Sequence, residues 1–235
     1  MQPGKIAEQL IQYIGGLQGG RLFKVEGLRN LLSEHQPHQA FTRSGAVQCI
    51  GIVKDGKPTG IEKHQDIYLA PRQRGGKLTA ENVFESLLSK KLVRAGLQFK
   101  CPRCDLEFWR SIDELGSTAR CEYCEDEFNV LPQLKDRDWK YRRSGLLGDY
   151  NHQEGAIPVI LTLQQLTGVV SHLWSPLFTT AHSLRLASDA TFKCETDFVF
   201  ICKGRVDEPL EIVIGECKTH HAIEEARRGE LGQGR

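Results

Sequence analysis

Two cysteine pairs constrain the fold of this chain more than any other feature of its sequence. They form two CxxC motifs with sixteen residues between them, at Cys101, Cys104, Cys121 and Cys124. This spacing predicts two knuckles that bring four thiolates to one tetrahedral zinc ion. Because protein sulfur would fill all four ligand positions, that zinc would be structural. Short alternating runs at 106–109 and 128–130 are typical of strands, so we predict a four-cysteine zinc ribbon over residues 97–130.

Other uses of the two motifs fit less well. A pair of disulfides or a redox-active CxxC is disfavoured, because the N-terminus shows no secretory signal and a thioredoxin-type motif would not occur as a spaced pair. Such a ribbon would bind nucleic acid, bind protein or simply stabilise a domain. Acidic side chains around the second motif argue against a DNA-clamping surface there, namely Glu122, Glu125, Asp126 and Glu127.

Two apolar runs in the last part of the chain, 194–202 and 210–214, predict a β-hairpin. If the strands pair symmetrically about the loop between them, residue 203 opposes residue 210 and Asp197 opposes Glu216. Directly opposed residues of an antiparallel pair point to the same side of the sheet. Lys218 lies two residues beyond Glu216 and shares that side. We therefore expect two carboxylates and an ammonium group together at the end of a largely buried hairpin.

These residue types suit metal-assisted hydrolysis of a phosphodiester. Mg²⁺ and similar hard cations prefer oxygen ligands, and a nearby lysine can hold the attacking water or offset developing charge. The alternative is a structural salt bridge, since the same register places Glu195 opposite Lys218. Charge on an apolar hairpin favours the catalytic interpretation, because buried charges are costly unless they are paired or bind metal.

The arrangement resembles the PD-(D/E)xK, or restriction-endonuclease-like, nuclease superfamily. Asp197 matches the first acid, Glu216 the second and Lys218 the lysine, while Thr196 stands where the family pattern has proline. The resemblance implies an α+β fold in which helices flank a mixed β-sheet, with a metal site on a central hairpin. Many members add a glutamate from the helix before the first core strand. Glu154 is the candidate here, although a solvent-exposed residue near a helix start is an equally ordinary interpretation.

The sequence therefore predicts a Mg²⁺- or Mn²⁺-dependent nuclease with DNA as its substrate and restriction, defence or repair as its family-level role. The predicted catalytic residues are Asp197, Glu216, Lys218 and Glu154, of which Asp197 and Glu216 would hold the metal. The main alternative is a non-enzymatic zinc-ribbon module that binds nucleic acid or protein and carries a degenerate nuclease fold. A scaffold subunit that docks a protein partner through its N-terminal helices is a third interpretation.

Composition limits the partners. The chain has 235 residues and a net charge of +1, so any polyanion binding must come from local patches. No segment approaches the length of a membrane span, and the N-terminus lacks a charged-then-apolar signal pattern. We therefore expect a cytoplasmic protein without a membrane partner.

Pattern changes along the chain predict four regions: a mixed N-terminal region at 1–96, the ribbon at 97–130, a linker at 131–143 and a nuclease-like domain at 144–235. Within the first region we expect a strand at 46–53 and helices at 6–14, 25–34 and 79–95.

The last two regions carry their own expectations. The linker interleaves basic residues with Trp139 and Tyr141, which would contact nucleic acid or pack on the nuclease-like domain. The nuclease-like domain should contain a helix at 157–170 and a strand that includes 184–186. Only seventeen residues follow Lys218, fewer than the helix and strand that close the resembled fold, so we expect either a truncated domain or one that closes by an unusual route.

Overall fold

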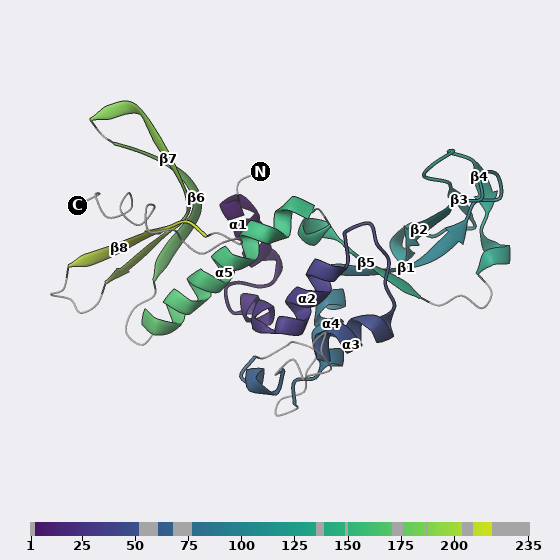
Figure 1. Ribbon diagram of the computed structural model, residues 1–235, viewed down its shortest axis with the longest axis horizontal. Coiled ribbons are helices and arrows are strands. Elements are labelled where there is room, and N and C mark those ends of the chain that lie inside the picture. The colour runs from purple at the N-terminus through teal and green to yellow at the C-terminus, as the bar shows by residue number, and fades with distance from the viewer. Residues whose placement is uncertain are drawn as a thin grey trace. The chain divides into compact units, whose positions relative to one another are not determined.

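The computed structural model describes residues 3–51, 61–67, 77–134, 139–148, 150–170, 176–186, 188–203 and 209–217. The chain forms two compact units, the larger consisting of Glu8–Gln153 and the smaller of Met1–Ala7 with Glu154–Arg235 (Figure 1). Helices and antiparallel sheets are both present, so the coarse prediction of a mixed α and β protein is confirmed. Every described strand pair is antiparallel, and no parallel pair of the expected mixed sheet lies within the described ranges.

Helical segments precede the first strand. They are α1 (Pro3–Tyr13), η1 (Gly19–Lys24), α2 (Glu26–Glu34), α3 (Arg43–Gly51), η2 (Ile61–His64) and α4 (Ala80–Ser89). The predicted helices at 6–14 and 25–34 correspond to α1 and α2. Thr79 caps α4: its hydroxyl accepts from the backbone N–H of Asn82, whose side chain accepts from the Thr79 N–H in return.

Two of the predicted elements in this region are wrong. The expected strand at 46–53 is helix α3 as far as the structure describes it, and its apolar residues Ala46 and Ile50 are buried at the four-residue spacing of a helix. The expected helix at 79–95 ends at Ser89, and Val93 begins strand β1 instead. A short apolar run fits the residue spacing of a helix and that of a strand, so the sequence pattern alone does not distinguish the two structures.

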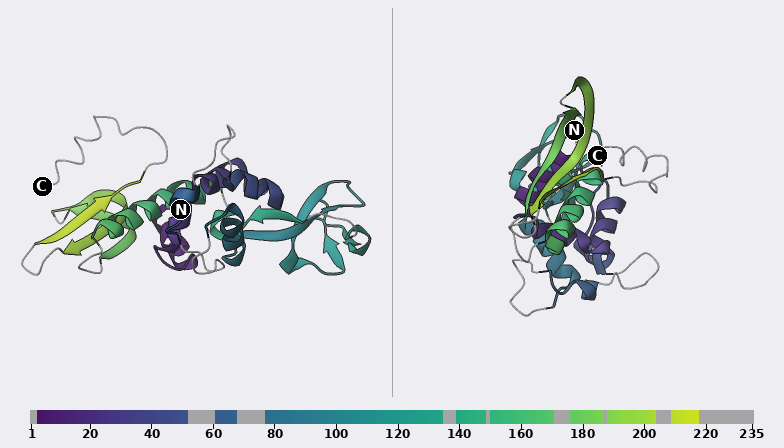
Figure 2. Two further views of the ribbon diagram at one scale, coloured as in Figure 1. Left: turned by 90° about the horizontal axis from the view of Figure 1, so that it is seen from below. Right: turned by 90° about the vertical axis from the view of Figure 1, so that its left-hand side faces the viewer.

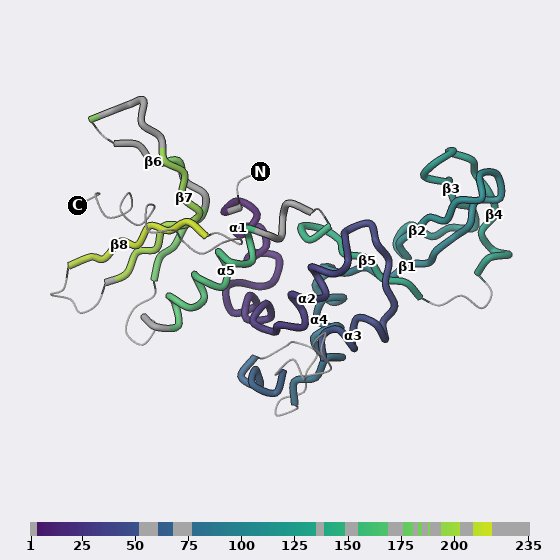
Figure 3. The backbone as a smooth tube through the Cα atoms, in the orientation of Figure 1, coloured from purple at the N-terminus to yellow at the C-terminus, as the bar shows by residue number. Residues whose placement is uncertain are grey.

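Strand β1 (Val93–Lys100) is the centre of a three-stranded sheet of order β2-β1-β5. The remaining elements of the larger unit are β2 (Glu107–Ser111), η3 (Ile112–Glu114), β3 (Thr118–Arg120), β4 (Glu127–Asn129), η4 (Leu131–Gln133), β5 (Lys140–Arg143) and η5 (Gly145–Leu147). The tube in Figure 3 follows the chain along β1 and back through β2. β1 runs across the boundary that we placed at residue 96, and β5 occupies the end of the predicted linker.

Strand β5 is fixed to the helices rather than left as a connector. Tyr141 packs edge-on against Phe84 of α4, with ring centroids 5.1 Å apart. The buried Arg143 guanidinium donates to the carbonyl oxygens of Leu32 at 2.9 Å and His35 at 3.0 Å, at the end of α2. Three features therefore join the cysteine region to the helices. They are the sheet in which β1 pairs with β5, the aromatic contact of Tyr141 with Phe84, and the buried Arg143 guanidinium.

The smaller unit contains most of helix α5 (Tyr150–Val170), followed by β6 (Leu177–Leu186), β7 (Asp189–Lys203) and β8 (Leu210–Gly215). The strands form an antiparallel sheet in chain order, with β7 in the centre, and α5 runs alongside it (Figures 1 and 2). The predicted strand residues 184–186 belong to β6. The predicted helix is present but begins at Tyr150 rather than Ile157, so Pro158 lies inside it, not near its start.

Burial differs between the two strands of the predicted hairpin. Phe198 and Phe200 of β7 are buried, whereas the apolar residues of β8 are exposed, Ile212 by 57%. The expectation of a largely buried hairpin is therefore wrong for β8. The strand has an apolar sequence, but its sequence does not show whether another element packs on it. None of the described helices has the length and apolar character needed to span a membrane.

Gly27 lets α2 and α3 approach each other closely. A Cβ atom at this position would lie 2.6 Å from the backbone carbonyl carbon of Ile50. We expect Gly27→Ala to lower the free energy of unfolding by about 1–3 kcal/mol, because two backbones must separate, despite the better helix propensity of alanine. Urea denaturation measures this change. Gly51→Ala in α3 is the matched control, since its Cβ would make an ordinary 3.4 Å contact with Ala80, and equal losses in both variants would contradict the prediction.

Candidate metal centre and carboxylate site

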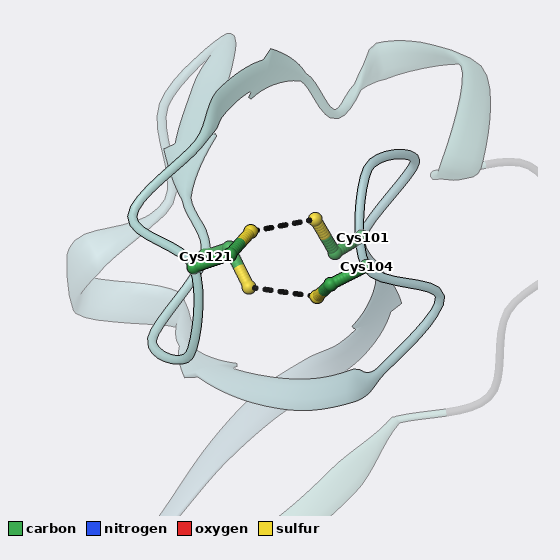
Figure 4. Close-up of side chains that lie close together, drawn as sticks. Cys101, Cys104 and Cys121 are labelled. Carbon is green, nitrogen blue, oxygen red and sulfur yellow. Dashed lines mark hydrogen bonds between the residues drawn. The ribbon is translucent and has the colours of Figure 1, made fainter.

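The four predicted zinc ligands come together between two loops. All four Sγ atoms lie within 4.8 Å of one another. The Sγ atoms of Cys101 and Cys124 are 3.5 Å apart, and those of Cys104 and Cys121 are 3.7 Å apart. Figure 4 shows the labelled cysteines directing their sulfur atoms into the space between the loops. A tetrahedral zinc ion with bonds of about 2.3 Å separates its sulfurs by about 3.8 Å, whereas a disulfide needs about 2.05 Å. The spacing fits a metal centre and excludes disulfides.

The two loops repeat the same backbone pattern. In each, the N–H of the residue two positions after the first cysteine donates to that cysteine's sulfur at 3.4 Å, from Arg103 in one loop and Tyr123 in the other. The residue after each second cysteine, Asp105 or Glu125, adopts a positive φ near 60°. Its N–H donates to the carbonyl oxygen of the first cysteine, at 3.0 Å and 3.1 Å respectively. The repeated turn explains how each CxxC motif aims two sulfurs at one point.

A small apolar core supports these loops. Its buried members are Leu97, Phe99, Cys101, Phe108, Cys121 and Val130. Phe108 contacts Phe99 on one side and Phe128 on the other, with centroid separations of 6.2 Å and 6.0 Å. Two of the six buried residues, Cys101 and Cys121, are members of the four-cysteine cluster, so the core and the cluster depend on each other. We refer to residues 93–130 as the cysteine module.

The cysteine cluster favours the loss of a proton from one thiol. Burial acts to raise the pKa of Cys121, but backbone N–H groups of Cys124 and Tyr123 donate to its sulfur and lower the pKa to about 7. The thiolate is the form that binds metal, so Cys121 is already close to its ligating state at neutral pH.

The second candidate site lies at the end of β8. The predicted register is confirmed, since Phe198 pairs with Gly215 and Lys203 with Leu210. Continued by one residue, this register places Asp197 opposite Glu216, just past the last paired position. Asp197 is only 9% exposed, and Glu216 is exposed.

A backbone hydrogen bond orients the buried carboxylate. The Cys217 N–H donates to Asp197 Oδ2 at 2.7 Å. Burial raises the pKa of the Cys217 thiol, and the negative charges of both Asp197 and Glu216 raise it further, so both carboxylates lie near this residue. Cys217 Sγ also lies 3.6 Å from Thr162 Oγ1, which connects the site to α5. The chain thus brings Asp197 and Glu216 to one end of the sheet.

Neighbouring residues fix the end of the sheet. The Thr196 hydroxyl donates to the Gly215 carbonyl oxygen at 2.7 Å. The ring of Phe198 covers Gly215 so closely that a Cβ at Gly215 would lie 3.0 Å or less from three ring atoms. Glycine at this position therefore permits the buried Phe198 to sit beside Asp197. Sequence reasoning noted Thr196 only as a departure from a motif, and its hydrogen bond gives it a structural reason.

The other two predicted catalytic residues are Lys218 and Glu154. Lys218 lies outside the described residues, and Glu154 lies within α5 rather than ahead of the predicted helix. Within the described ranges, the only cluster of three or more potential metal ligands is the four-cysteine cluster. The carboxylate site therefore consists of Asp197 and Glu216 as far as the structure shows it.

The fold and sites define a mixed α and β protein with a four-cysteine cluster able to hold one zinc ion. No protein-family model and no solved structure matches the chain. It is 30% identical over 84 residues to the Shiftless antiviral inhibitor of ribosomal frameshifting protein homolog of Xenopus tropicalis, covering 34% of this chain and 28% of that protein. The Xenopus laevis homolog is 27% identical over 113 residues, covering 46% and 34%. The chain thus spans about a third of the length of these relatives.

Proposed function

We propose that this protein is a metal-dependent nuclease, with a structural zinc ion at the four-cysteine cluster. The observation that carries the proposal is the β7–β8 register, which brings the buried Asp197 and the exposed Glu216 to one end of the sheet. DNA is the substrate that the family resemblance implies. The names of the amphibian relatives point to translation, so RNA is the substrate to be tested beside it.

The order of elements supports the proposal. A helix precedes three antiparallel strands, the first acid stands on the central strand, and the second follows the next strand. This is the order that the resemblance to PD-(D/E)xK nucleases implies for the metal-binding half of the domain. We therefore propose the restriction-endonuclease-like fold for the smaller unit.

The carboxylates fit the expected metal in donor chemistry. Oxygen is the donor that Mg²⁺ and Mn²⁺ prefer, and Asp197 and Glu216 would hold the ion between them. The bound ion would polarise the scissile phosphate and stabilise the leaving oxygen. The hydrogen bond from the Cys217 N–H orients the Asp197 carboxylate and leaves it negatively charged. Lys218 would hold the attacking water or offset charge on the phosphate.

Cleavage assays test the proposal. Wild-type protein with Mg²⁺ or Mn²⁺ is expected to cut plasmid DNA, linear DNA or RNA, and Lys218→Ala is expected to slow cutting by about 10²-fold or more, by analogy with the loss of one group that stabilises transition-state charge. Lys203→Ala, which removes a lysine from the far end of β7, is the matched control and should retain activity. Absence of cutting on all three substrates, with no divalent ion bound at the carboxylates, would refute the nuclease.

A second function is favoured by the four-cysteine cluster and by the partial similarity to the frameshifting inhibitors. In this case the protein is a non-enzymatic zinc module that binds nucleic acid or protein, and the N-terminal helices would dock a protein partner. Metal analysis separates the two proposals. The nuclease requires a second divalent ion that is lost on replacing Asp197 or Glu216, whereas the binding module holds zinc at the cysteines alone.

A further inference from the structure

One face of the β2-β1-β5 sheet gathers basic side chains. Arg94 of β1 lies directly opposite Arg142 of β5, and Gly96 lies opposite Lys140. On the other side of β1, Gln98 lies opposite Trp109. Directly opposed residues and alternate residues along a strand share a face, so these side chains lie on one side of the sheet. The intervening residues, such as Leu97 and Phe99, point to the apolar core instead. We call Arg94, Arg142, Lys140 and Trp109 the arginine face.

The side chains of this face are held in position. A Cβ at Gly96 would lie 2.5–2.6 Å from two atoms of the Trp109 ring, so the indole lies directly across this glycine. The Trp109 Nε1–H donates to the Lys140 carbonyl oxygen at 3.3 Å. The Arg142 guanidinium lies over the Trp109 ring, 5.2 Å from its centroid. A glycine, a hydrogen bond and a cation–π contact thus order one arginine before any ligand arrives.

The arginine face differs in charge balance from the other basic residues of the cysteine module. Other basic residues there have acidic partners within 4.0 Å, in the pairs Lys100–Asp105, Arg103–Asp126, Arg110–Glu114 and Arg120–Glu125. Within the described part of the chain, Arg94, Arg142 and Lys140 have no such ion pair. The Nε atoms of Arg94 and Arg142 are buried and have no hydrogen-bond acceptor among the described residues.

This arrangement is unfavourable for the protein alone. Like charges directly opposed across two strands destabilise a sheet, and buried donors without acceptors cost further free energy. A polyanion would neutralise the positive charge of both arginines. Trp139 comes directly before β5 and is 47% exposed, so an exposed aromatic ring stands at the end of the strand that carries Lys140 and Arg142. Unpaired bases can stack on such a ring, whereas those of a duplex are already stacked on each other.

We propose that the arginine face binds single-stranded nucleic acid, with Arg94, Arg142 and Lys140 on phosphates and Trp139 stacking on a base. This site is separate from the carboxylates and does not depend on cleavage. The negative charge of Glu122 acts on the Arg142 guanidinium from beyond ion-pair distance. Glu122 therefore weakens the attraction of this face for phosphate.

Binding to a fluorescently labelled 20-nucleotide strand, DNA or RNA, tests the proposal in zinc-loaded full-length protein without added Mg²⁺. We expect the double variant Arg94→Gln, Arg142→Gln to bind at least about tenfold more weakly. The slope of log K against log salt should fall by about 1.4, since each lost phosphate contact on a single strand contributes about 0.7. The matched control is Arg103→Gln, Arg120→Gln, which removes the same charge from cations that already have acidic partners.

Glu122→Gln guards against a folding artefact, because it changes an exposed residue and is expected to tighten binding severalfold. Equal losses of affinity in the double variant Arg94→Gln, Arg142→Gln and in the control double variant would overturn the proposal. It would also be overturned if neither Glu122→Gln nor the Arg94→Gln, Arg142→Gln variant changed the affinity. Duplex DNA bound as tightly as a single strand would overturn the assignment to unpaired bases. A failure here leaves the cleavage assay unaffected, so the two proposals fail separately.

Discussion

Cys121→Ser is expected to abolish zinc binding and unfold the cysteine module. Cys121 is 2% exposed and belongs to the six-residue buried core, so the change removes a ligand and places a hydroxyl among apolar side chains. A structural zinc site of this kind contributes an apparent free energy of about 10–16 kcal/mol in peptides at neutral pH, far more than so small a core supplies. Zinc content by mass spectrometry and thermal unfolding followed by circular dichroism measure the loss.

The unfolding should extend beyond the module. β1 pairs with β2 on one edge and with β5 on the other, and β5 is anchored to α2 through Arg143. Loss of the zinc centre should therefore also lower the melting temperature of the helical part. Cys194→Ser is the matched control, because Cys194 is exposed and lies outside the cluster. A Cys121→Ser variant that retains one zinc per chain and melts like wild type would show that the four cysteines do not form a structural site.

Local chemistry made part of this fold predictable. The start of α4 was predicted near Thr79, and a threonine there can cap a helix with its own hydroxyl. The hairpin register follows from symmetric pairing about its loop, and β7 and β8 keep that register over six residue pairs. The four-cysteine cluster is equally local, because each CxxC motif contains its own turn.

The predictions that were wrong concern segments whose structure depends on contacts with residues far away in the sequence. Residues 46–50 look like a strand, but Gly27 of α2 allows Ile50 to pack as part of a helix. Residues 92–95 continue a helical pattern, yet the partners that draw Val93 and Ala95 into a strand lie near residue 142. The exposure of β8 likewise depends on what covers it, and its own sequence carries no such information.

The candidate sites show the same difference between local and distant contacts. The sequence identified Asp197 and Glu216 because one hairpin brings them together, and Cys101 and Cys121 because a familiar spacing does. It missed the arginine face, although contact with nucleic acid was one of two interpretations of the basic and aromatic run near Trp139, the other being packing on the nuclease-like domain. Arg94 and Arg142 are far apart in the chain, and only the pairing of β1 with β5 makes them neighbours.

Asp197→Asn is expected to reduce cleavage by roughly 10³-fold while leaving the fold intact. The change removes the negative charge that would hold the divalent ion, and each 1.36 kcal/mol of lost transition-state stabilisation slows the reaction tenfold. The asparagine side-chain oxygen can still accept the Cys217 N–H, so the hydrogen bond that orders the end of β8 is kept. Single-turnover cleavage and urea denaturation measure the two effects on the same protein.

Comparison with Asp197→Ala separates catalysis from structure at this residue. Alanine leaves the Cys217 N–H without that acceptor, so it should lower the free energy of unfolding by about 1–3 kcal/mol in addition to stopping cleavage. Glu211→Gln is the matched control, since it removes an exposed carboxylate from β8 near its other end, where Glu211 pairs with Cys202, and should retain activity. A structural salt bridge predicts a different result, in which Asp197→Asn loses stability and cleavage does not change. Retained cleavage in Asp197→Asn would therefore remove Asp197 from the catalytic site and leave it as a structural residue.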